Sequence, residues 1–393
     1  MLGITALLAV GVLSLEGRLG PRLLESTRAS DRELVRVPQV TGARAACSWA
    51  LERFSSGPKL YAVATSGRDV WAVGIDASRR PAVLRRRGGT WQRVPLPSRD
   101  KGQLNDVAVT SSGEVWMVGD SFVDFSVRPL VLRFDGRRLV AVAAPDRHGL
   151  ATLVAIAAGP GVRGRAGIWV GGGDFAAGVF DPFVILRASS RGWENLPGGR
   201  ISEGLIQAIA ATSATEAWAV GAQGGADSIV TFDSLVLRWD GRRWRPMNIP
   251  AERINDPDGE PVDALSGVAA RGRKQAWAVG YDQVGGVALH WQGRSWERSP
   301  IAKPSPRELT GVASSASAAW AVGHRDSGQG QRPVLLRWSG GRWLRAAQPA
   351  SGLRAALEGV AVSDTQGQAW AVGGYGDYED GQMKTLILHY RCR

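Results

Sequence analysis

The sequence predicts an all-β fold: a seven-bladed β-propeller of four-stranded antiparallel blades, with the last blade closed by the N-terminal strand. Two observations predict it. A tryptophan motif recurs seven times along the 393 residues, and further strand-like segments surround each copy. Repeats at intervals of about 20–50 residues are typical of solenoids and propellers. The composition agrees, because 51 glycines, 16 tryptophans and only 21% charged residues are untypical of helical arrays and of disordered chains.

The central motif is Trp-Ala-Val-Gly or a close variant. It begins at Trp71, Trp116, Trp169, Trp218, Trp277, Trp320 and Trp370. Alternation along a strand places Trp and Val on one blade face and Ala and Gly on the other, so bulky residues meet small ones between blades. We therefore interpret the seven tryptophans as packing residues rather than as a platform for a ligand.

Other strands of each blade are predicted from segments on either side of the motif. Segments of small residues precede it, at residues 62–65, 107–110, 155–158, 208–211, 267–270, 311–314 and 359–362. The segment after the motif is predicted to form the third strand, a tight turn and the fourth strand. Residues 236–244 are its clearest example, because Asp240-Gly241 separates two β-prone runs and glycine tolerates the positive φ of a tight hairpin. Small residues suit the innermost strand, where blades converge, and bulky residues suit the outer strands.

The third strand of each repeat carries a recurring cationic or aromatic position. It is occupied by Arg85, Arg133, Arg187, Arg238 and Arg337, with His290 and His389 in its place in two repeats. An arginine that packs its stem and stacks its guanidinium on an aromatic ring is common in such positions. We therefore predict that this position is structural, with the arginine packed and stacked on a blade tryptophan rather than binding a ligand.

Closure of the ring is predicted from the two ends of the repeat region. The seventh repeat lacks a fourth strand, and residues 47–54 match the fourth-strand pattern. Aligning Tyr390 with Trp239, and Trp49 with Trp244, makes Cys47 and Cys392 neighbours. We predict a Cys47–Cys392 disulfide, since modest relaxation brings such neighbours within bonding distance. A disulfide implies an oxidising compartment, and we expect a secreted or cell-envelope protein of bacterial origin.

Three segments divide the chain. Residues 1–18 are predicted to be a signal peptide or short anchor, because residues 2–15 are uncharged and mostly apolar but shorter than a membrane span of about 20 residues. Residues 19–45 are predicted to be a linker, and residues 46–393 a single propeller. Membrane contact is expected only through an uncleaved N-terminal segment, and the propeller is expected to be a monomer.

The repeats resemble known propellers. The Asp-Gly-x-x-Trp turn at Asp240–Trp244 resembles the Asp-box of sialidase-type and photosystem assembly factor-type propellers, although the usual Asp-box places one residue between Asp and Gly. Trp-Ala-Val-Gly followed by Leu-x-Trp-Asp-Gly-x-x-Trp is similar to exported repeat proteins of actinobacteria. The resemblance covers residues 47–393 and implies the fold. Sialidases bind a carboxylate with a triad of arginines and use a tyrosine activated by a glutamate. No motif in this sequence matches either group of residues.

Composition and motifs argue against several functions. A net charge of +12 invites nucleic-acid binding, but only five residues are lysine and many arginines recur at fixed repeat positions, which favours a structural role. The four histidines lack the spacing of metal ligands, and no Gly-x-x-x-x-Gly-Lys phosphate loop is present. We therefore predict no metal, no cofactor and no nucleic-acid partner.

The candidate binding residues lie in the connections between second and third strands, which vary between repeats and emerge on one face of the disc. Loops of this kind on a rigid ring are where binding usually resides. The candidates are Asp76, Asp120, Asp124, Asp174, Asp227, Tyr281, Asp282, Asp326, Tyr375 and Asp377.

Carboxylates and aromatic rings suit a polyhydroxylated or cationic ligand. We predict a non-catalytic binding or scaffolding propeller that recognises an envelope glycan or a protein. A glycan-active, sialidase-like hydrolase or lyase on the same face is the alternative. Aspartate also favours turns for purely structural reasons, and that interpretation stays open.

Overall fold

The computed structural model describes residues 47–67, 69–145, 152–159, 167–173, 183–189, 192–201, 204–225, 228–250, 263–363, 367–376 and 382–392. The predicted signal peptide and linker lie outside these residues. Residues Ala45–Arg393 form one compact unit. Within the described ranges, no helix has the length and apolar character needed to cross a membrane.

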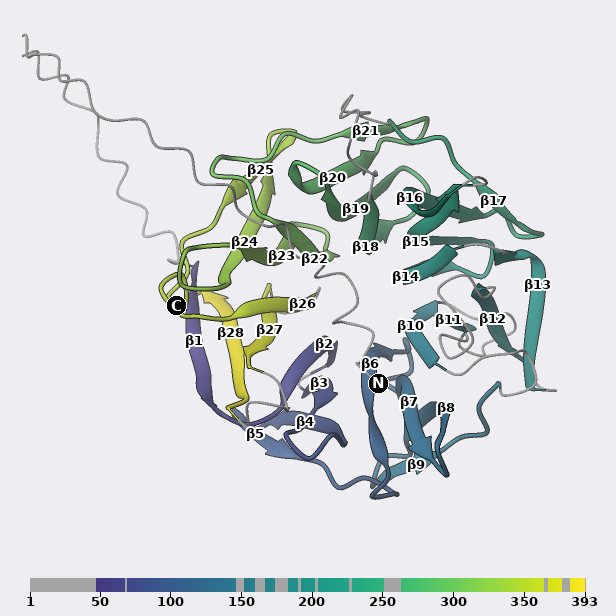
Figure 1. Ribbon diagram of the computed structural model, residues 1–393, viewed down its shortest axis with the longest axis vertical. Helices are drawn as coiled ribbons and strands as arrows, with labels where there is room; N and C mark the ends of the chain where they lie inside the picture. Colours follow the sequence, from purple (N-terminus) through teal and green to yellow (C-terminus); the bar gives the residue numbers. More distant parts are fainter. Residues whose placement is uncertain are drawn as a thin grey trace, which may run out of the picture. The chain divides into compact units, whose positions relative to one another are not determined.

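The described residues form seven four-stranded antiparallel sheets, numbered here as blades 1 to 7 (Figure 1). Blade 1 contains β2 (Lys59–Ser66), β3 (Asp69–Ile75), β4 (Pro81–Arg87) and β5 (Thr90–Arg93). Blade 2 contains β6 (Lys101–Val109), β7 (Val115–Val123), β8 (Ser126–Phe134) and β9 (Leu139–Ala141). Blade 3 contains β10 (Thr152–Gly159), β11 (Gly167–Gly173), β12 (Phe183–Ser189) and β13 (Gly192–Ile201).

The remaining blades repeat this order. Blade 4 contains β14 (Gly204–Ser213), β15 (Glu216–Gly225), β16 (Ser228–Trp239) and β17 (Trp244–Pro246). Blade 5 contains β18 (Ala264–Arg271), β19 (Gln275–Asp282), β20 (Gly285–Trp291) and β21 (Trp296–Arg298). Blade 6 contains β22 (Glu308–Ser314), β23 (Ala319–Arg325), β24 (Arg332–Ser339) and β25 (Arg342–Arg345). Blade 7 contains β26 (Ala356–Val362), β27 (Ala369–Tyr375), β28 (Lys384–Cys392) and β1 (Cys47–Ser56).

The blades close into a ring, as the sequence predicts. The innermost strand of each blade contacts that of the next, and β26 of the last blade contacts β2 of the first. Figure 1 shows the sheets arranged radially with these strands toward the centre. The predicted seven-bladed architecture, with the N-terminal strand completing blade 7, is confirmed.

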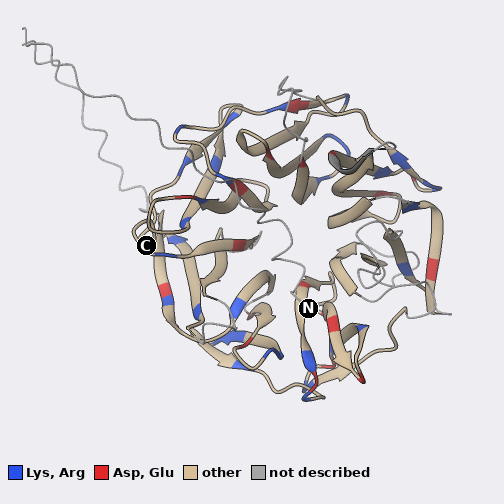
Figure 2. Ribbon diagram, viewed as in Figure 1, with Lys and Arg blue, Asp and Glu red and all other residues tan. Residues whose placement is uncertain are grey.

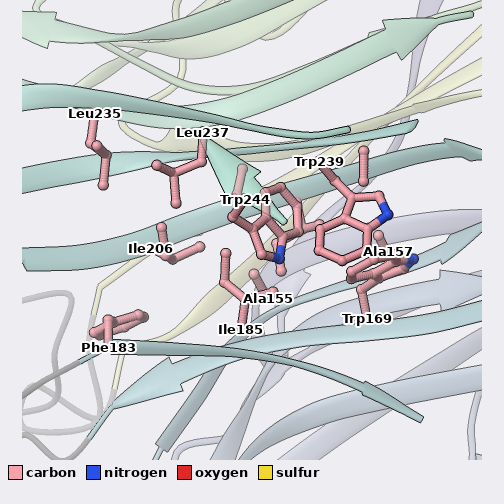
Figure 3. Close-up of a cluster of buried hydrophobic side chains, with 13 residues drawn as sticks. Ala155, Ala157, Trp169, Phe183, Ile185, Ile206, Leu235, Leu237, Trp239 and Trp244 are labelled. Atoms are coloured by element: carbon pink, nitrogen blue, oxygen red, sulfur yellow. The ribbon is translucent and has the colours of Figure 1, made fainter. Parts of the chain in front are cut away.

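The core lies between blades and is built from the motif tryptophans. Six of the seven are at most 3% exposed, and Trp116 is half-buried. Figure 3 shows the seam between blades 3 and 4, where the ring of Trp169 lies 5.5 Å from the ring of Trp239 and 5.5 Å from that of Trp244. Such edge-to-face arrangements are the favoured geometry of aromatic pairs. The tryptophans therefore serve packing.

The recurring third-strand position stacks on the motif tryptophan in all seven blades. The guanidinium of Arg85 lies 4.7 Å from the ring centre of Trp71, and that of Arg238 lies 5.1 Å from that of Trp218. Arg133, Arg187 and Arg337 stack in the same way in blades 2, 3 and 6, and His290 and His389 stack in blades 5 and 7. The predicted structural role of these side chains is confirmed.

The glycine of the motif has a role that alternation between blade faces does not explain. In each blade it pairs with a residue beside a β-bulge in the innermost strand; in blade 6, Gly323 pairs with Leu309. A Cβ at these seven glycines would lie 1.9–2.1 Å from a backbone carbonyl oxygen of that strand. The glycine therefore gives the two backbones of one blade room to approach each other, in addition to any contact with the next blade.

The last blade closes in the predicted register. Trp49 lies opposite Tyr390, as Trp244 lies opposite Trp239 in blade 4. Cys47 lies directly opposite Cys392, and the two form a disulfide with their Cα atoms 3.8 Å apart. Strand β1 thereby covers the edge of β28, which would otherwise expose unpaired backbone groups.

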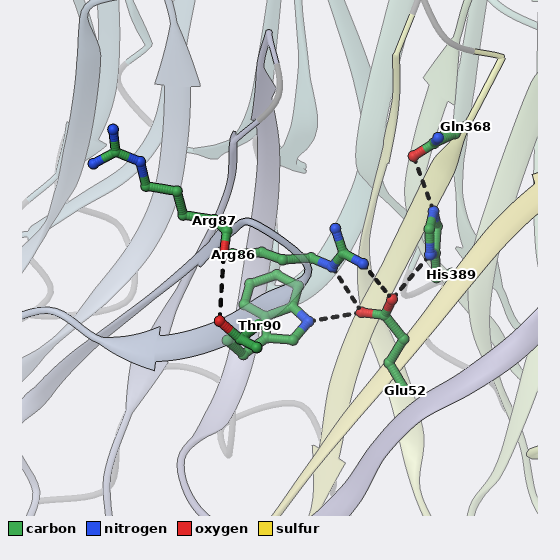
Figure 4. A network of polar contacts seen from close by, with 7 residues as sticks. Glu52, Arg86, Arg87, Thr90, Gln368 and His389 are labelled. Carbon is green, nitrogen blue, oxygen red and sulfur yellow. Dashed lines mark hydrogen bonds and ion pairs between the residues drawn. The ribbon is translucent and has the colours of Figure 1, made fainter.

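A polar network holds β1 to blade 1 as well as to blade 7 (Figure 4). The carboxylate of Glu52 accepts hydrogen bonds from Arg86 at 3.0 Å and from Trp91 Nε1 at 2.8 Å, both on blade 1. It also lies 2.9 Å from Nδ1 of His389 on blade 7. Burial alone would raise the pKa of Glu52, but the bonds from His389, Trp91 and Arg86 outweigh burial and lower it to about 2. The carboxylate therefore joins the first and last blades.

Candidate functional site

Each innermost strand contains a β-bulge at the same point, and the bulges leave one unpaired residue per blade. These seven bulge residues are Tyr61, Asn105, Val154, Gln207, Ser266, Thr310 and Glu358. All seven are half-buried, whereas the Leu or Ile before each is 0% exposed. Bulges bend a strand and re-aim a side chain. The fold therefore presents seven side chains of different types at the inner edge of the ring.

Polar and charged side chains gather on one arc of this inner edge, over blades 5, 6, 7 and 1. Lys59 and Glu308 begin the innermost strands of blades 1 and 6, and Tyr281 and His324 follow the motif glycine in blades 5 and 6. With the bulge residue Glu358 they form what we call the rim cluster. Innermost strands begin on the face where the second-to-third connections emerge, so the rim cluster shares that face. Figure 2 shows an acidic segment on the innermost strand β26.

Glu308 is the least compensated carboxyl of the rim cluster. Burial and the nearby charge of Glu358 raise its pKa to about 7, against the hydrogen bond from Ser266 and the charges of Arg307 and Lys59, which lower it. Ser266 Oγ on blade 5 lies 3.5 Å from its Oε1 atom. Among the described residues Glu308 forms no ion pair, whereas Glu358 pairs with Lys59 at 3.2 Å. A buried carboxyl without a cation carries a desolvation cost.

His324 and Tyr281 also have polar atoms without partners. His324 is 8% exposed, and its Nδ1 atom is buried without a hydrogen bond to any described residue. Burial lowers the pKa of His324. The Tyr281 hydroxyl is likewise buried and unbonded within the described part of the chain, and burial, with the charge of Glu308, raises its pKa to about 12. Such unsatisfied groups are uncommon in native proteins and call for an explanation.

Two of the predicted binding residues, Asp76 and Asp282, have structural roles. Asp282 accepts hydrogen bonds from the backbone N–H groups of Val284 at 2.8 Å and Gly285 at 3.0 Å, and it pairs with Arg298. Asp76 holds its turn in the same way and pairs with the equivalent arginine of blade 1, Arg93. The preference of aspartate for turns accounts for both.

Asp120 lies in a strand rather than in the expected loop, because β7 and β8 extend to a two-residue turn at Asp124 and Phe125. The φ angles of these turn residues are 49° and 63°. Burial raises the pKa of Asp120 to about 6, against hydrogen bonds with Asn105 and Gln103 that lower it. Asp120 therefore belongs to the inner edge, on blade 2, whereas the side chain of Asp124 is exposed at the turn.

The other predicted residues divide into three groups. Tyr281 belongs to the rim cluster. Asp326 lies beside it, 3.9 Å from Arg307, and Tyr375 packs against the core of blade 7 with the guanidinium of Arg354 5.1 Å from its ring centre. Asp174, Asp227 and Asp377 lie outside the described residues.

Sequence reasoning missed Lys59, Glu308, His324 and Glu358. A signal was present for Glu358, the bulge residue among them, because in six blades the bulge residue immediately precedes the small-residue segment and differs in type from blade to blade while its neighbours repeat. Within the described ranges, no group of three or more His, Cys, Asp or Glu residues is arranged to hold a metal ion.

Comparisons with solved structures place the chain among propellers. A chain of YCF48 bound to a D1 peptide is 16% identical, with a TM-score of 0.55 over 88% of this chain and 97% of that one. U3-55K is 10% identical, with a TM-score of 0.56 over 86% and 98%. A chain of the mitotic checkpoint complex is 13% identical, with a TM-score of 0.53 over 93% and 99%. These likenesses show the fold. Neither a family model nor a curated protein matches the sequence.

Proposed function

We propose that this chain is a non-catalytic binding propeller that recognises a protein partner on the face that carries the rim cluster. The observation that supports the proposal is a set of three buried groups: the Glu308 carboxyl, which forms no ion pair, and the Tyr281 hydroxyl and the His324 Nδ1 atom, which have no hydrogen-bond partner among the described residues. Leaving such groups unsatisfied costs about 1–3 kcal/mol each. A partner molecule that supplies the missing hydrogen bonds recovers this free energy on binding.

Two further points favour a protein partner. The structural neighbours include a propeller whose structure is that of a complex with a peptide, and another from a multiprotein complex. The disulfide suits an oxidising compartment, so we propose a partner in the cell envelope or outside the cell. An envelope glycan is the competing ligand class.

The proposal is tested by screening the disulfide-bonded chain against a displayed library of random 12-residue peptides and against a glycan array. We expect the wild type to retain peptides, and we expect Glu308→Gln and Tyr281→Phe to weaken their binding at least tenfold. Glu297→Gln is the matched control, because Glu297 is exposed on the outermost strand of blade 5. Binding of glycans without peptides would overturn the protein partner. Peptide binding that no rim variant alters would place the site elsewhere.

One observation favours a second candidate function, a glycan-active hydrolase. With a pKa of about 7, Glu308 is about half protonated at neutral pH, whereas its neighbour Glu358 is ion-paired with Lys59. Two carboxyl groups in unequal environments are what a glycosidase uses as acid and as nucleophile or base. Hydrolysis of any glycan in a substrate panel, abolished in both Glu308→Gln and Glu358→Gln, would replace the binding proposal with the enzyme.

A further inference from the structure

Charge is balanced unequally among the carboxylates at the rim cluster. Lys59 lies 3.2 Å from Glu358, and Arg307 lies 3.9 Å from Asp326. Glu308, which follows Arg307 at the start of β22 in blade 6, forms no ion pair with any described residue. Its surroundings therefore lack one positive charge, which an incoming group can supply.

The imidazole of His324 and the hydroxyl of Tyr281 are suited to accept hydrogen bonds from that same incoming group. Burial lowers the pKa of His324, and a neutral imidazole has one acceptor nitrogen. The hydroxyl oxygen of Tyr281 is also an acceptor. Both atoms are buried without a hydrogen-bond partner in the described part of the chain.

Strand register and a contact between blades 5 and 6 bring the three groups to the same region. Glu308 and His324 are directly opposite across β22 and β23, so their side chains leave the same face of blade 6. The contact with Ser266 shows that the Glu308 carboxyl also reaches blade 5. Tyr281 on blade 5 lies close enough for the charge of Glu308 to raise the pKa of its hydroxyl.

We propose that Glu308, His324 and Tyr281 bind a primary ammonium group, supplied by a lysine side chain or the free N-terminus of the protein partner. An ammonium group has three N–H donors and one positive charge. The Glu308 carboxylate, the His324 ring nitrogen and the Tyr281 oxygen together offer three acceptors and one negative charge without an ion-pair partner, which match this number and this charge. This inference rests on the proposed function and specifies the chemistry of recognition.

Other ligand chemistries fit these groups less well. An anion would be repelled by the carboxylates of Glu308 and Glu358, and the nearby cations Lys59 and Arg307 already pair with Glu358 and Asp326. A guanidinium is planar and prefers two parallel bonds to one carboxylate, which leaves the imidazole and phenol acceptors unused. A divalent metal prefers a set of several charged or imidazole ligands, and no such set is present among the described residues.

Small amines test the inference directly. The full chain, labelled with ¹⁵N in its histidines, is titrated with Nα-acetyl-lysine N-methylamide for the side-chain source and with glycine N-methylamide for the N-terminal source. We expect a saturable shift of the His324 ring nitrogens with at least one amine. We expect no shift with Nα,Nε-diacetyl-lysine N-methylamide, which keeps the shape and loses the charge.

Variants separate specific binding from general attraction to a carboxylate. We expect Glu308→Gln to weaken amine binding at least tenfold and Tyr281→Phe to weaken it about threefold, while Glu297→Gln leaves it unchanged. The melting temperature of each variant shows whether it is folded, and His324→Asn, read out by calorimetry, provides an independent variant. Equal binding by the diacetylated compound, by an arginine analogue or by Glu308→Gln would overturn the inference.

The same reagents distinguish this inference from the proposed function. If selected peptides bind the wild type with unchanged affinity after lysine acetylation and N-terminal acetylation, ammonium recognition is wrong and the protein-binding function stands. If the amines bind as expected but no peptide or protein does, ammonium recognition stands and the proposed function is wrong.

Discussion

The side chain of Glu308 couples the rim cluster to the stability of the fold. Its pKa is raised from 4.5 to about 7, so the folded state holds a proton between these values that the unfolded state has already released. Stability therefore falls as pH rises through this interval. Asp106 and Asp120, whose pKa values burial raises to about 7 and about 6, act in the same direction.

Glu308→Gln tests this coupling, because the amide keeps the shape of the protonated acid and cannot ionise. We expect the variant to be about 1–3 kcal/mol more stable than the wild type at pH 8 and nearly equal to it at pH 5. Urea denaturation at the two pH values measures the difference. Glu297→Gln should show no such pH dependence. Equal destabilisation by Glu308→Gln at both pH values would contradict the assignment of Glu308 as a buried, uncompensated acid.

At the scale of the strand, the bulge and the motif glycine act as a pair. The bulge turns one side chain of the innermost strand toward the inner edge. The motif glycine on the second strand pairs with the residue before the bulge and lets the backbones of these two strands come close. A Cβ at Gly323 would lie 2.1 Å from the carbonyl oxygen of Glu308, a contact that only backbone movement can relieve. The motif glycine thus permits the close approach of the two strands beside the bulge.

We expect Gly323→Ala to destabilise the protein by about 2–4 kcal/mol through backbone strain and loss of pairing between β22 and β23. Gly328→Ala, in the same blade, is the control, because a Cβ there meets no atom within 4 Å. Thermal unfolding of both variants measures the contrast. If the two alanines had equal effects, the close approach at Gly323 would not be a packing constraint.

At the scale of the whole ring, closure depends on β1, which the disulfide and the Glu52 network hold in place. Cross-linking residues 345 apart removes much of the freedom of the unfolded chain, worth up to about 5 kcal/mol in the chain-entropy account. We expect Cys47→Ser to lose about 3–5 kcal/mol in denaturant unfolding. Adding Cys392→Ser should cost little more, because the bond needs both partners. Oxidised and reduced wild type of equal stability would refute this role of the bond.

The Glu52 carboxylate contributes to the same closure through charge. Its pKa falls from 4.5 to about 2 on folding, so its contribution is complete above pH 4.5 and is lost as pH falls toward 2. We expect Glu52→Gln to cost about 1–2 kcal/mol at pH 7, after allowing for partial solvent screening, and much less at pH 2. Glu194→Gln, which removes a more exposed ion pair with Arg187, should change stability by only a few tenths of a kcal/mol.

The whole-ring features were predictable because they repeat. Seven copies of one motif determine the blade, and two cysteines at equivalent ends of a split blade determine the closure. The rim cluster was not predictable in the same way. Tyr281 was a candidate from its place in a variable connection, but Glu308 and His324 come from two further strands, and no motif in the sequence links the three. Asp76 and Asp282 were conspicuous in sequence because turns need them.

The disulfide also determines how the ring would carry a mechanical load. Handles attached before Cys47 and after Cys392 would pull across a single sulfur–sulfur bond, so none of the seven blades would lie on the path of the force. Reduction would open that path and expose 345 residues, or about 1,200 Å of extended chain, to unravelling. In the oxidised protein the distance between the two handles would therefore stay nearly constant under load. In the reduced protein that distance would grow as the blades unfold.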